Sequence, residues 1–347
     1  MPTQRDRFRR DAVTMKDVAR VAGVSQSTVS RVLTPTSGGV VISDETRQRV
    51  LAAVQTLGYH PNQYARTLRG QKSRMIAMMI ADISNPFYHP MVRAVQDVAF
   101  KHQYDVMIAN SDHARDKEVL FLESVARRPV DGVILIPYHI ADAELDDLIS
   151  RTGVAVGAVG GHIRHPLVDT VSANDARASL DLVDWLIRER GHQRIAMICA
   201  DRRFPVTQRR LDSFQRAMAA AGLDVPDEYV VEGDWSVASG QRGLRRLMAL
   251  DEAPTAVFAA SDTIAIGALE MAQELGLDVP GDIAIVGFDD IPEARWVRPR
   301  LTTVAQFPAD MGQLLATALF QRIETGEAAP ERQVFEVACR FVQRDSA

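Results

Sequence analysis

The pattern of apolar and polar positions changes near residue 75 and predicts a different kind of structure on either side. Between residues 14 and 58, apolar side chains recur three and four positions apart in three short segments, which predicts three helices. After Met75, short apolar runs alternate with longer amphipathic segments. This alternation is typical of buried parallel strands connected by helices. The sequence therefore predicts a small all-α domain followed by an α/β body.

The first segment contains local signals for the ends of its three helices. Thr14 is the expected N-cap of the first, and Asp17 three residues later completes a capping box. Ser25 and Ser43 are placed to cap the second and third helices, and Gly58 ends the third. The expected inward faces comprise Val18, Val21 and Ala22, then Val29, Val32 and Leu33, and then Val50, Ala53, Val54 and Leu57.

The turn between the first two helices reads A-G-V-S at residues 22–25. Two short helices joined in this way, with a third behind them, form a helix-turn-helix whose second helix enters the DNA major groove. Gln26, Ser27 and Arg31 face outward on that helix and are the candidates to read bases, because Gln pairs with adenine and Arg with guanine. The candidate phosphate contacts are Ser25, Thr28, Ser30 and Ser43. A three-helix bundle with a merely polar outer face is the alternative.

The distribution of charge decides between these two interpretations. The chain of 347 residues has a net charge of −5. Residues 1–74 contain 13 Lys and Arg against 5 Asp and Glu, a net charge of +8, so the remainder carries −13. A basic segment attached to an acidic body indicates that this end of the chain meets a polyanion. We therefore predict that the three-helix segment binds double-stranded DNA.

The body is predicted to contain two sets of parallel strands. Helical segments such as 91–102 and 117–127 lie between the strands. Doubly wound sheets bind ligands at the carboxyl ends of their strands, and two such sets predict two lobes with a cleft between them. The expected strands are Met75–Ala81, Val106–Ala109, Gly132–Ile136, Val154–Val159, Asp169–Ala173, Ile195–Cys199, Tyr229–Glu232, Ala256–Ala260 and Ile283–Phe288.

Carboxylates, amides and one tryptophan follow several of these strands. Residues 82–88 follow the first strand, residues 233–236 follow Glu232, and residues 287–290 close another strand. Charged groups that bond hydroxyls beside an aromatic ring suit recognition of a sugar or polyol. The alternative is that these Asp and Asn residues cap the next helix.

Other classes of function find little support. Cys199 and Cys339 lie far apart, as expected of reduced thiols in the cytoplasm. No apolar run approaches the roughly 20 residues of a membrane helix, and the arginine-rich start lacks the apolar core of a secretory signal. His162 and His165 form H-x-x-H without a cluster of further ligands, and neither a dinucleotide-binding fingerprint nor a nucleophile elbow is found. We expect no metal, no cofactor, no membrane association and no enzyme activity.

Several stretches resemble a known family. Residues 14–33 (T-M-K-D-V-A-R-V-A-G-V-S-Q-S-T-V-S-R-V-L), 43–51 (S-D-E-T-R-Q-R-V-L) and 57–70 (L-G-Y-H-P-N-Q-Y-A-R-T-L-R-G) resemble the opening signature of the lactose/galactose-repressor (LacI/GalR) family. In the body, D-I-S-N-P-F-Y, G-D-W-S-V-A-S-G, A-S-D-T-I-A-I-G-A-L, V-G-F-D-D-I and R-P-R-L-T-T-V resemble its effector-domain motifs. The resemblance implies an N-terminal all-α helix-turn-helix domain plus a two-lobed α/β effector domain with the type I periplasmic-binding-protein fold.

The resemblance also implies a division of the chain. The expected parts are a flexible basic arm (1–13), the DNA-binding domain (14–59), a hinge (60–74) and an effector-binding and dimerisation domain (75–347). The N-lobe is expected at about 75–173 and 303–333, and the C-lobe at about 174–302 and 334–347.

The hinge is the second expected DNA contact. In the family this segment folds into a short helix on operator DNA. Leu68 resembles the leucine that wedges into the minor groove, with Ala65 packing beside it and Arg66 and Arg69 flanking it. The loop at 34–41 is a few residues longer than usual in the family, which puts its DNA contacts in doubt.

The resemblance further implies a set of effector contacts, namely Phe87, Tyr88, Arg210, Trp235, Ser261 and Asp289. Gly160 and Gly161 stand where many members have Asp-Arg, which removes a usual hydroxyl-binding acid. Positive charge is expected near the cleft from loop residues instead, and it leads to the hypothesis of a sugar acid or another anionic metabolite. These loop residues are His162, Arg164, Arg202 and Arg203.

Together these features predict a cytoplasmic, nucleoid-associated transcription regulator, a repressor, whose affinity for a pseudo-palindromic operator is controlled by a small-molecule effector. A homodimer is expected because the leucine-heptad tail that forms tetramers in the lactose repressor is not found after Val342. The alternatives are a solute-binding protein, a sugar-modifying enzyme with an appended DNA anchor, and a nucleoid-type DNA protein without ligand control.

Overall fold

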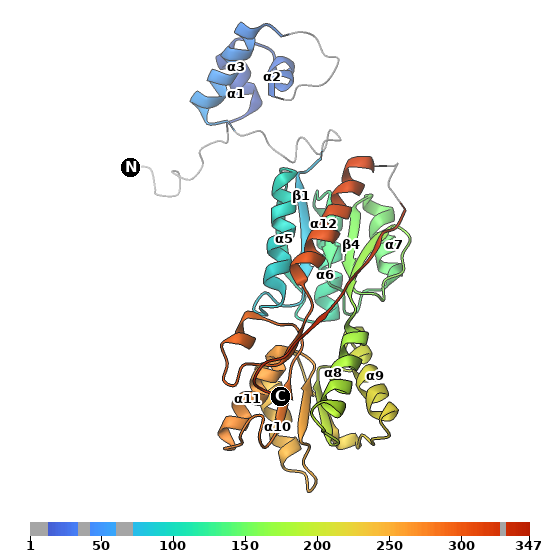
Figure 1. Ribbon diagram of the computed structural model, residues 1–347. Helices are drawn as coiled ribbons and strands as arrows, with labels where there is room; N and C mark the ends of the chain where they lie inside the picture. The colour runs from blue at the N-terminus through green and yellow to red at the C-terminus, as the bar shows by residue number, and fades with distance from the viewer. Residues whose placement is uncertain (1–12, 34–41, 60–71, 327–330) are drawn as a thin grey trace, which may run out of the picture. The chain divides into compact units, whose positions relative to one another are not determined.

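The computed structural model describes residues 13–33, 42–59, 72–326 and 331–347. These residues belong to two units, one that ends at Ser73 and one that begins at Arg74 (Figure 1). Within the described ranges, no helix is long and apolar enough to cross a membrane.

The first unit contains the three predicted helices, α1 (Met15–Ala22), α2 (Gln26–Leu33) and α3 (Asp44–Leu57). Thr14 caps α1 in the predicted capping box with Asp17. The helices enclose a small core around Val18, Val29 and Val50, all fully buried. The prediction for Val21 is wrong, since 53% of this residue is exposed. Helix α1 packs through Val18, Ala19 and Ala22 instead.

The N-lobe of the second unit is built on a six-stranded parallel sheet. Its order is β11-β5-β4-β3-β1-β2, and in its centre Ile76 of β1 lies opposite Gly132 of β3. Helices α5 and α12 pack against one face, and α6 and α7 pack against the other. The strands are β1 (Met75–Ile80), β2 (Asp105–Asn110), β3 (Gly132–Leu135), β4 (Ala155–Val159), β5 (Val168–Ala173) and β11 (Val334–Val337). The helices are α5 (Tyr88–Lys101), α6 (Arg115–Arg127), α7 (Asp142–Thr152) and α12 (Pro308–Thr325).

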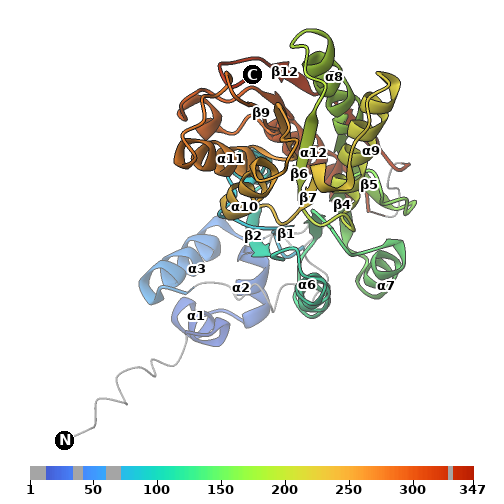
Figure 2. The same cartoon turned by 90° about the horizontal axis from the view of Figure 1, so that it is seen from below.

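The C-lobe has a four-stranded parallel sheet in the order β7-β6-β8-β9. Helices α8 and α9 pack together, as do α10 and α11, and Figure 2 shows the two pairs on opposite sides of the sheet. The strands are β6 (Ile195–Cys199), β7 (Val230–Glu232), β8 (Ala256–Ala259) and β9 (Ala284–Val286). The helices are α8 (Asp175–Arg188), α9 (Pro205–Ala220), α10 (Val237–Met248) and α11 (Asp262–Glu274), with short 3-10 turns at Asp227–Tyr229 and Pro292–Arg295.

The described chain passes between the lobes near residues 174, 306 and 338 (Figure 1). Here the expected lobe boundaries need correction. Strand β11 pairs with β5 and extends the N-lobe sheet, although residues 334–337 were expected in the C-lobe. Strand β10 (Thr303–Ala305) runs beside the C-lobe, where Asp289 N donates to Val304 O at 2.8 Å, and it pairs with β12 (Arg340–Val342). The three crossings lie together between the lobes, so each lobe is joined to the other at one end of its sheet (Figure 1).

Candidate functional site

The outer face of α2 carries the three residues predicted to read bases. Gln26, Ser27 and Arg31 are all exposed, and Val29 and Val32 on the opposite side of the helix are buried in the core. Ser27 and Arg31 are four residues apart, so they lie on the same helical face. The core therefore fixes which side of α2 is presented outward.

The serines and threonines predicted to contact phosphates have a second role at the helix ends. Ser25 Oγ accepts from Thr28 N at 3.1 Å and lies 2.9 Å from Thr28 Oγ1. Ser43 Oγ accepts from Thr46 N at 3.3 Å and begins α3. Ser30 is half-buried. Phosphate contact by these side chains stays a prediction.

The hinge prediction concerns residues that the structure does not describe. Ala65, Arg66, Leu68 and Arg69 all lie within 60–71, and the loop at 34–41 also falls outside the described ranges.

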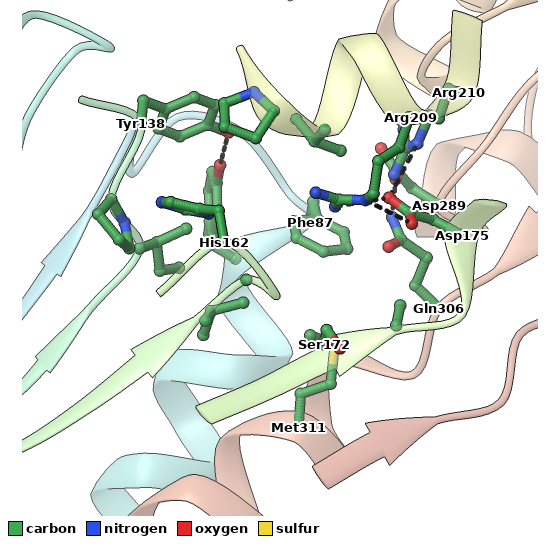
Figure 3. Close-up of a pocket in the computed structure, with 18 of the residues that line it drawn as sticks. Phe87, Tyr138, His162, Ser172, Asp175, Arg209, Arg210, Asp289, Gln306 and Met311 are labelled. Atoms are coloured by element: carbon green, nitrogen blue, oxygen red, sulfur yellow. Dashed lines mark hydrogen bonds and ion pairs between the residues drawn. The ribbon is translucent and has the colours of Figure 1, made fainter. Parts of the chain in front are cut away.

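A pocket lies between the lobes at the carboxyl ends of the strands. About 790 Å³ of space free of protein atoms lies here, part of it open to solvent. Figure 3 shows its lining, with His162 on one side and the Arg and Asp side chains on the other. The pocket residues are Asn85, Phe87, Tyr88, Ile136, Pro137, Tyr138, Val159, Gly160, His162, Ser172, Ala173, Asp175, Pro205, Val206, Arg209, Arg210, Trp235, Asp289, Gln306 and Met311.

One wall is formed by two consecutive arginines of α9 and two carboxylates. Arg209 donates to both oxygens of Asp175, from Nε and from a terminal nitrogen, each at 3.0 Å. Arg210 is only 3% exposed; its guanidinium carbon lies 3.9 Å from the ring centre of Phe288, and it donates to the carbonyl of Ala260. These contacts fix both guanidinium groups in the pocket wall.

Asp289 occupies the same wall, where Gln306 Nε2 donates to its Oδ1. Burial raises the pKa of Asp289 to about 7, although Arg210 and Gln306 act in the opposite direction. Behind it, burial and the neighbouring Asp289 raise the pKa of Asp262 to about 8. Thr303 Oγ1 and the backbone N of Ile291 donate to Asp262. Near neutral pH the wall therefore holds less negative charge than its carboxylates suggest.

Aromatic side chains and His162 form the remaining lining. The hydroxyls of Tyr88 and Tyr138 lie 3.1 Å apart, and the rings of Phe87 and Tyr88 meet edge to face with centroids 5.2 Å apart. Burial and the nearby Arg209 lower the pKa of His162, so its imidazole is neutral at pH 7. Gly160 has φ +121°, which only glycine adopts readily, and a Cβ there would meet the His162 ring at 3.1 Å.

Comparisons with known proteins agree with this architecture. Residues 14–62 match the family described as bacterial regulatory proteins, lacI family, and residues 186–347 match a periplasmic binding protein-like domain. The chain is 36% identical over 301 residues to catabolite control protein A of Priestia megaterium, which covers 86% of this chain and 89% of that protein. The chain belongs to the LacI family. It is a DNA-binding transcription regulator with a helix-turn-helix and a periplasmic-binding-protein-like domain.

Other relatives span nearly all of this LacI-family chain. The HTH-type transcriptional repressor CytR of Escherichia coli (strain K12) is 32% identical over 337 residues, which are 96% of both chains. The lac repressor dimer bound to operator and the anti-inducer ONPF superimposes with a TM-score of 0.80, at 26% identity over 97% of this chain and 99% of that one. The transcriptional regulator CelR in complex with cellobiose superimposes with a TM-score of 0.71. Its sequence identity is 29%, over 96% of this chain and 100% of that one.

Within this LacI-family pocket, the structure brings together five of the six effector contacts implied by the resemblance. These are Phe87, Tyr88, Arg210, Trp235 and Asp289. Ser261 is not among the lining residues; its hydroxyl accepts from Ile264 N at 3.3 Å and caps α11, and the residue is 2% exposed. Ser261 therefore caps α11, and an effector contact by this residue stays a prediction.

The cations expected near the pocket are only partly those that line it. His162 is a lining residue, and Arg164 is exposed and not part of the lining. Arg202 pairs with Glu232, with Nε 3.3 Å from Oε2, and Arg203 pairs with Asp201. The arginines that line the pocket are Arg210, which was an expected effector contact, and Arg209, which was not. Its place beside Arg210 in Q-R-R-L was the available signal.

Proposed function

We propose that this protein is a transcriptional repressor that binds a pseudo-palindromic operator as a homodimer and responds to a small metabolite in the interlobe pocket. The observation that carries the proposal is a pair of units in one chain. One presents Gln26, Ser27 and Arg31 on an exposed helix face, and the other encloses a polar and aromatic pocket. A two-fold symmetric dimer presents two such helices to two half-sites.

The proposed link between the two sites is closure of the lobes. The pocket is lined from both lobes, so a ligand that fills it favours one angle between them over another. The N-lobe begins with β1 directly after the proposed hinge (60–74), in which Leu68 enters the minor groove and Ala65, Arg66 and Arg69 support it. Movement of the N-lobes in a dimer would then change the spacing of the two hinges and the affinity for DNA.

The proposal assigns a sugar, sugar acid or related metabolite to the pocket. Trp235 and Phe87 supply aromatic faces, and Arg210 and Asp289 supply charged partners for hydroxyl groups. The CelR–cellobiose complex is a structural relative with a bound sugar.

Selection of binding sites from random duplexes, followed by fluorescence anisotropy with the selected duplex, tests the DNA side. We expect a two-fold symmetric consensus, and Gln26→Ala should lose about 1–3 kcal/mol of discrimination at one base pair per half-site. Lys16→Ala, an exposed change on α1, is the control. If the selection yields no consensus and all duplexes bind with equal affinity, sequence-specific recognition is refuted.

A further inference from the structure

The hydrogen-bonding capacity of the pocket is unevenly distributed between donors and acceptors. Both oxygens of Asp175 accept from Arg209, and one oxygen of Asp289 accepts from Gln306. In contrast, three buried nitrogens of the lining have no hydrogen-bond partner within the described residues: Arg210 Nε, Trp235 Nε1 and His162 Nε2. Asp175 Oδ2 lies 3.8 Å from Arg210 Nε, which is beyond hydrogen-bond distance.

The nature of these nitrogens restricts the ligand. The Arg and Trp nitrogens always carry a hydrogen and can only donate. A buried donor that stays unsatisfied costs about 1–3 kcal/mol, so a ligand gains most by presenting acceptors to them. A hydroxyl group is one acceptor, and a carboxylate offers about four acceptor positions matched to a planar guanidinium.

The charges of the pocket also favour a ligand that carries a negative charge. Arg209 and Arg210 contribute two positive charges, Asp175 contributes one negative charge, and Asp289 titrates near neutral pH. The net charge of the pocket therefore becomes more positive as Asp289 takes up a proton, because the charges of the arginines are then less fully compensated. The titratable and charged groups around Asp289 are Arg210, Asp262, Tyr88, Tyr138 and Cys339.

We propose that the effector is a hydroxylated monocarboxylic acid, such as an aldonate or uronate, whose carboxylate binds the Arg209 and Arg210 side of the pocket. Its hydroxyl groups reach Asp289 and His162, and its carbon chain or ring packs on Trp235 and Phe87. Figure 3 shows that the arginines and His162 face each other across the space, so the two ends of one small ligand can meet both. This inference rests on the proposed function and names the class of its ligand.

A phosphate ester is less suited to this pocket than a monocarboxylate. Asp175 and Asp289 lie beside the arginines, and a second negative charge on the ligand would be repelled by them. Sugar phosphates are therefore expected to bind more weakly than the acids.

Isothermal titration calorimetry with the full chain tests the proposal through matched ligand pairs. The pairs are gluconate and glucitol, galactonate and galactitol, glucuronate and glucose, and galacturonate and galactose, with glucose 6-phosphate as the doubly charged probe. We expect at least one acid to bind ten or more times as tightly as its neutral partner. Equal or tighter binding of the neutral partners, tighter binding of the phosphate, or no binding by any acid overturns the proposal.

The pH dependence of ligand affinity is a second, independent test of the proposal. Ionised Asp289 repels a carboxylate, so the acid prefers the protonated form, and the raised pKa of Asp289 predicts weaker binding of the acid at pH 8 than at pH 6. A neutral ligand that donates hydroxyls to ionised Asp289 would instead bind more tightly as the pH rises. That opposite slope contradicts the proposal.

Variants separate charge recognition from folding. Arg209→Gln should weaken binding of the acid at least ten times more than binding of its neutral partner, and Arg209→Lys should recover part of the loss because it restores the charge. Arg203→Gln, an exposed residue outside the pocket, is the matched control. If a neutral metabolite binds and shifts operator affinity, only this inference fails. If no bound ligand shifts operator affinity, the proposed function fails.

Discussion

Glu118 is a buried carboxylate that holds one edge of the pocket. Replacing it should show how much this carboxylate contributes to the free energy of unfolding. This residue of α6 is fully buried, and its oxygens accept from the backbone N of Tyr138 at 2.8 Å and of His139 and Ile140 at 3.0 Å each. The three donors follow one another in the loop after β3, which carries Tyr138 into the pocket. Glu118→Gln keeps the shape of the side chain and removes its charge.

The magnitude follows from these three hydrogen bonds. Glutamine keeps one acceptor oxygen and turns an NH2 group toward backbone N–H donors, so at least one donor loses its partner. An unsatisfied buried donor costs about 1–3 kcal/mol, and the bonds that remain lose the contribution of the charge, so we expect the free energy of unfolding to fall by about 2–4 kcal/mol.

Urea denaturation followed by far-UV circular dichroism is the assay. Circular dichroism is preferred to tryptophan fluorescence because Trp185, Trp235 and Trp296 all belong to the C-lobe. Glu123→Gln is the matched control on the same helix, where an exposed carboxylate pairs with Arg127 at 2.8 Å, and little change is expected. If Glu118→Gln unfolds at the same urea concentration as Glu123→Gln, the reasoning is refuted.

Three further substitutions test other parts of the account. Thr14→Ala removes the capping box and should destabilise α1 by about 1 kcal/mol, measured as faster hydrogen exchange in that helix. Gly240→Ala places a Cβ 1.9 Å from the carbonyl oxygen of Ile264, so α10 and α11 must separate, and thermal unfolding should reveal a loss of about 1–3 kcal/mol or more. Phe204→Ala removes a C-lobe ring whose centroid lies 4.9 Å from that of Tyr138 in the N-lobe. Without ligand, small-angle scattering of this variant should show a larger radius of gyration than that of the unmodified protein.

Each substitution has a control or a contradicting result. Thr14→Ser keeps the capping oxygen and should exchange at the native rate. Gly161→Ala should be tolerated, since its Cβ would find no atom nearer than Ser172 Oγ at 3.9 Å, and equal melting temperatures for the two glycine variants would contradict the packing argument. Unchanged scattering by Phe204→Ala would show that this ring does not hold the lobes together.

Much of the fold could be predicted because its signals are local. The caps at Thr14, Ser25 and Ser43 depend on side chains within three residues of the backbone they bond, and the buried strands are continuous apolar runs. Val21 could not be placed correctly, because a helix of two turns offers several apolar stripes and only the packing of α1 against its neighbours selects one. Strand β11 was missed because it is short, half-exposed and paired with a strand distant in sequence.

The pocket was predictable only where a motif marked its residues. Asp289 and Trp235 follow strands in recognisable motifs, and the structure places both in the lining. The importance of Arg209 depends on its bidentate contact with Asp175, which comes from another helix, and its place beside Arg210 does not reveal that contact. Ser261 follows a strand in the same way as Asp289, and only the geometry shows that its hydroxyl turns back to cap α11.

The central claim is that one chain links a DNA site to a pocket site. It is tested most directly by titrating the effector found by calorimetry into the full chain twice, with and without saturating operator duplex, and by measuring operator affinity with and without saturating effector. The account predicts that both pairs of measurements change by the same factor, of roughly 5–150. Effector affinity and operator affinity that are each unchanged by the other ligand would contradict it.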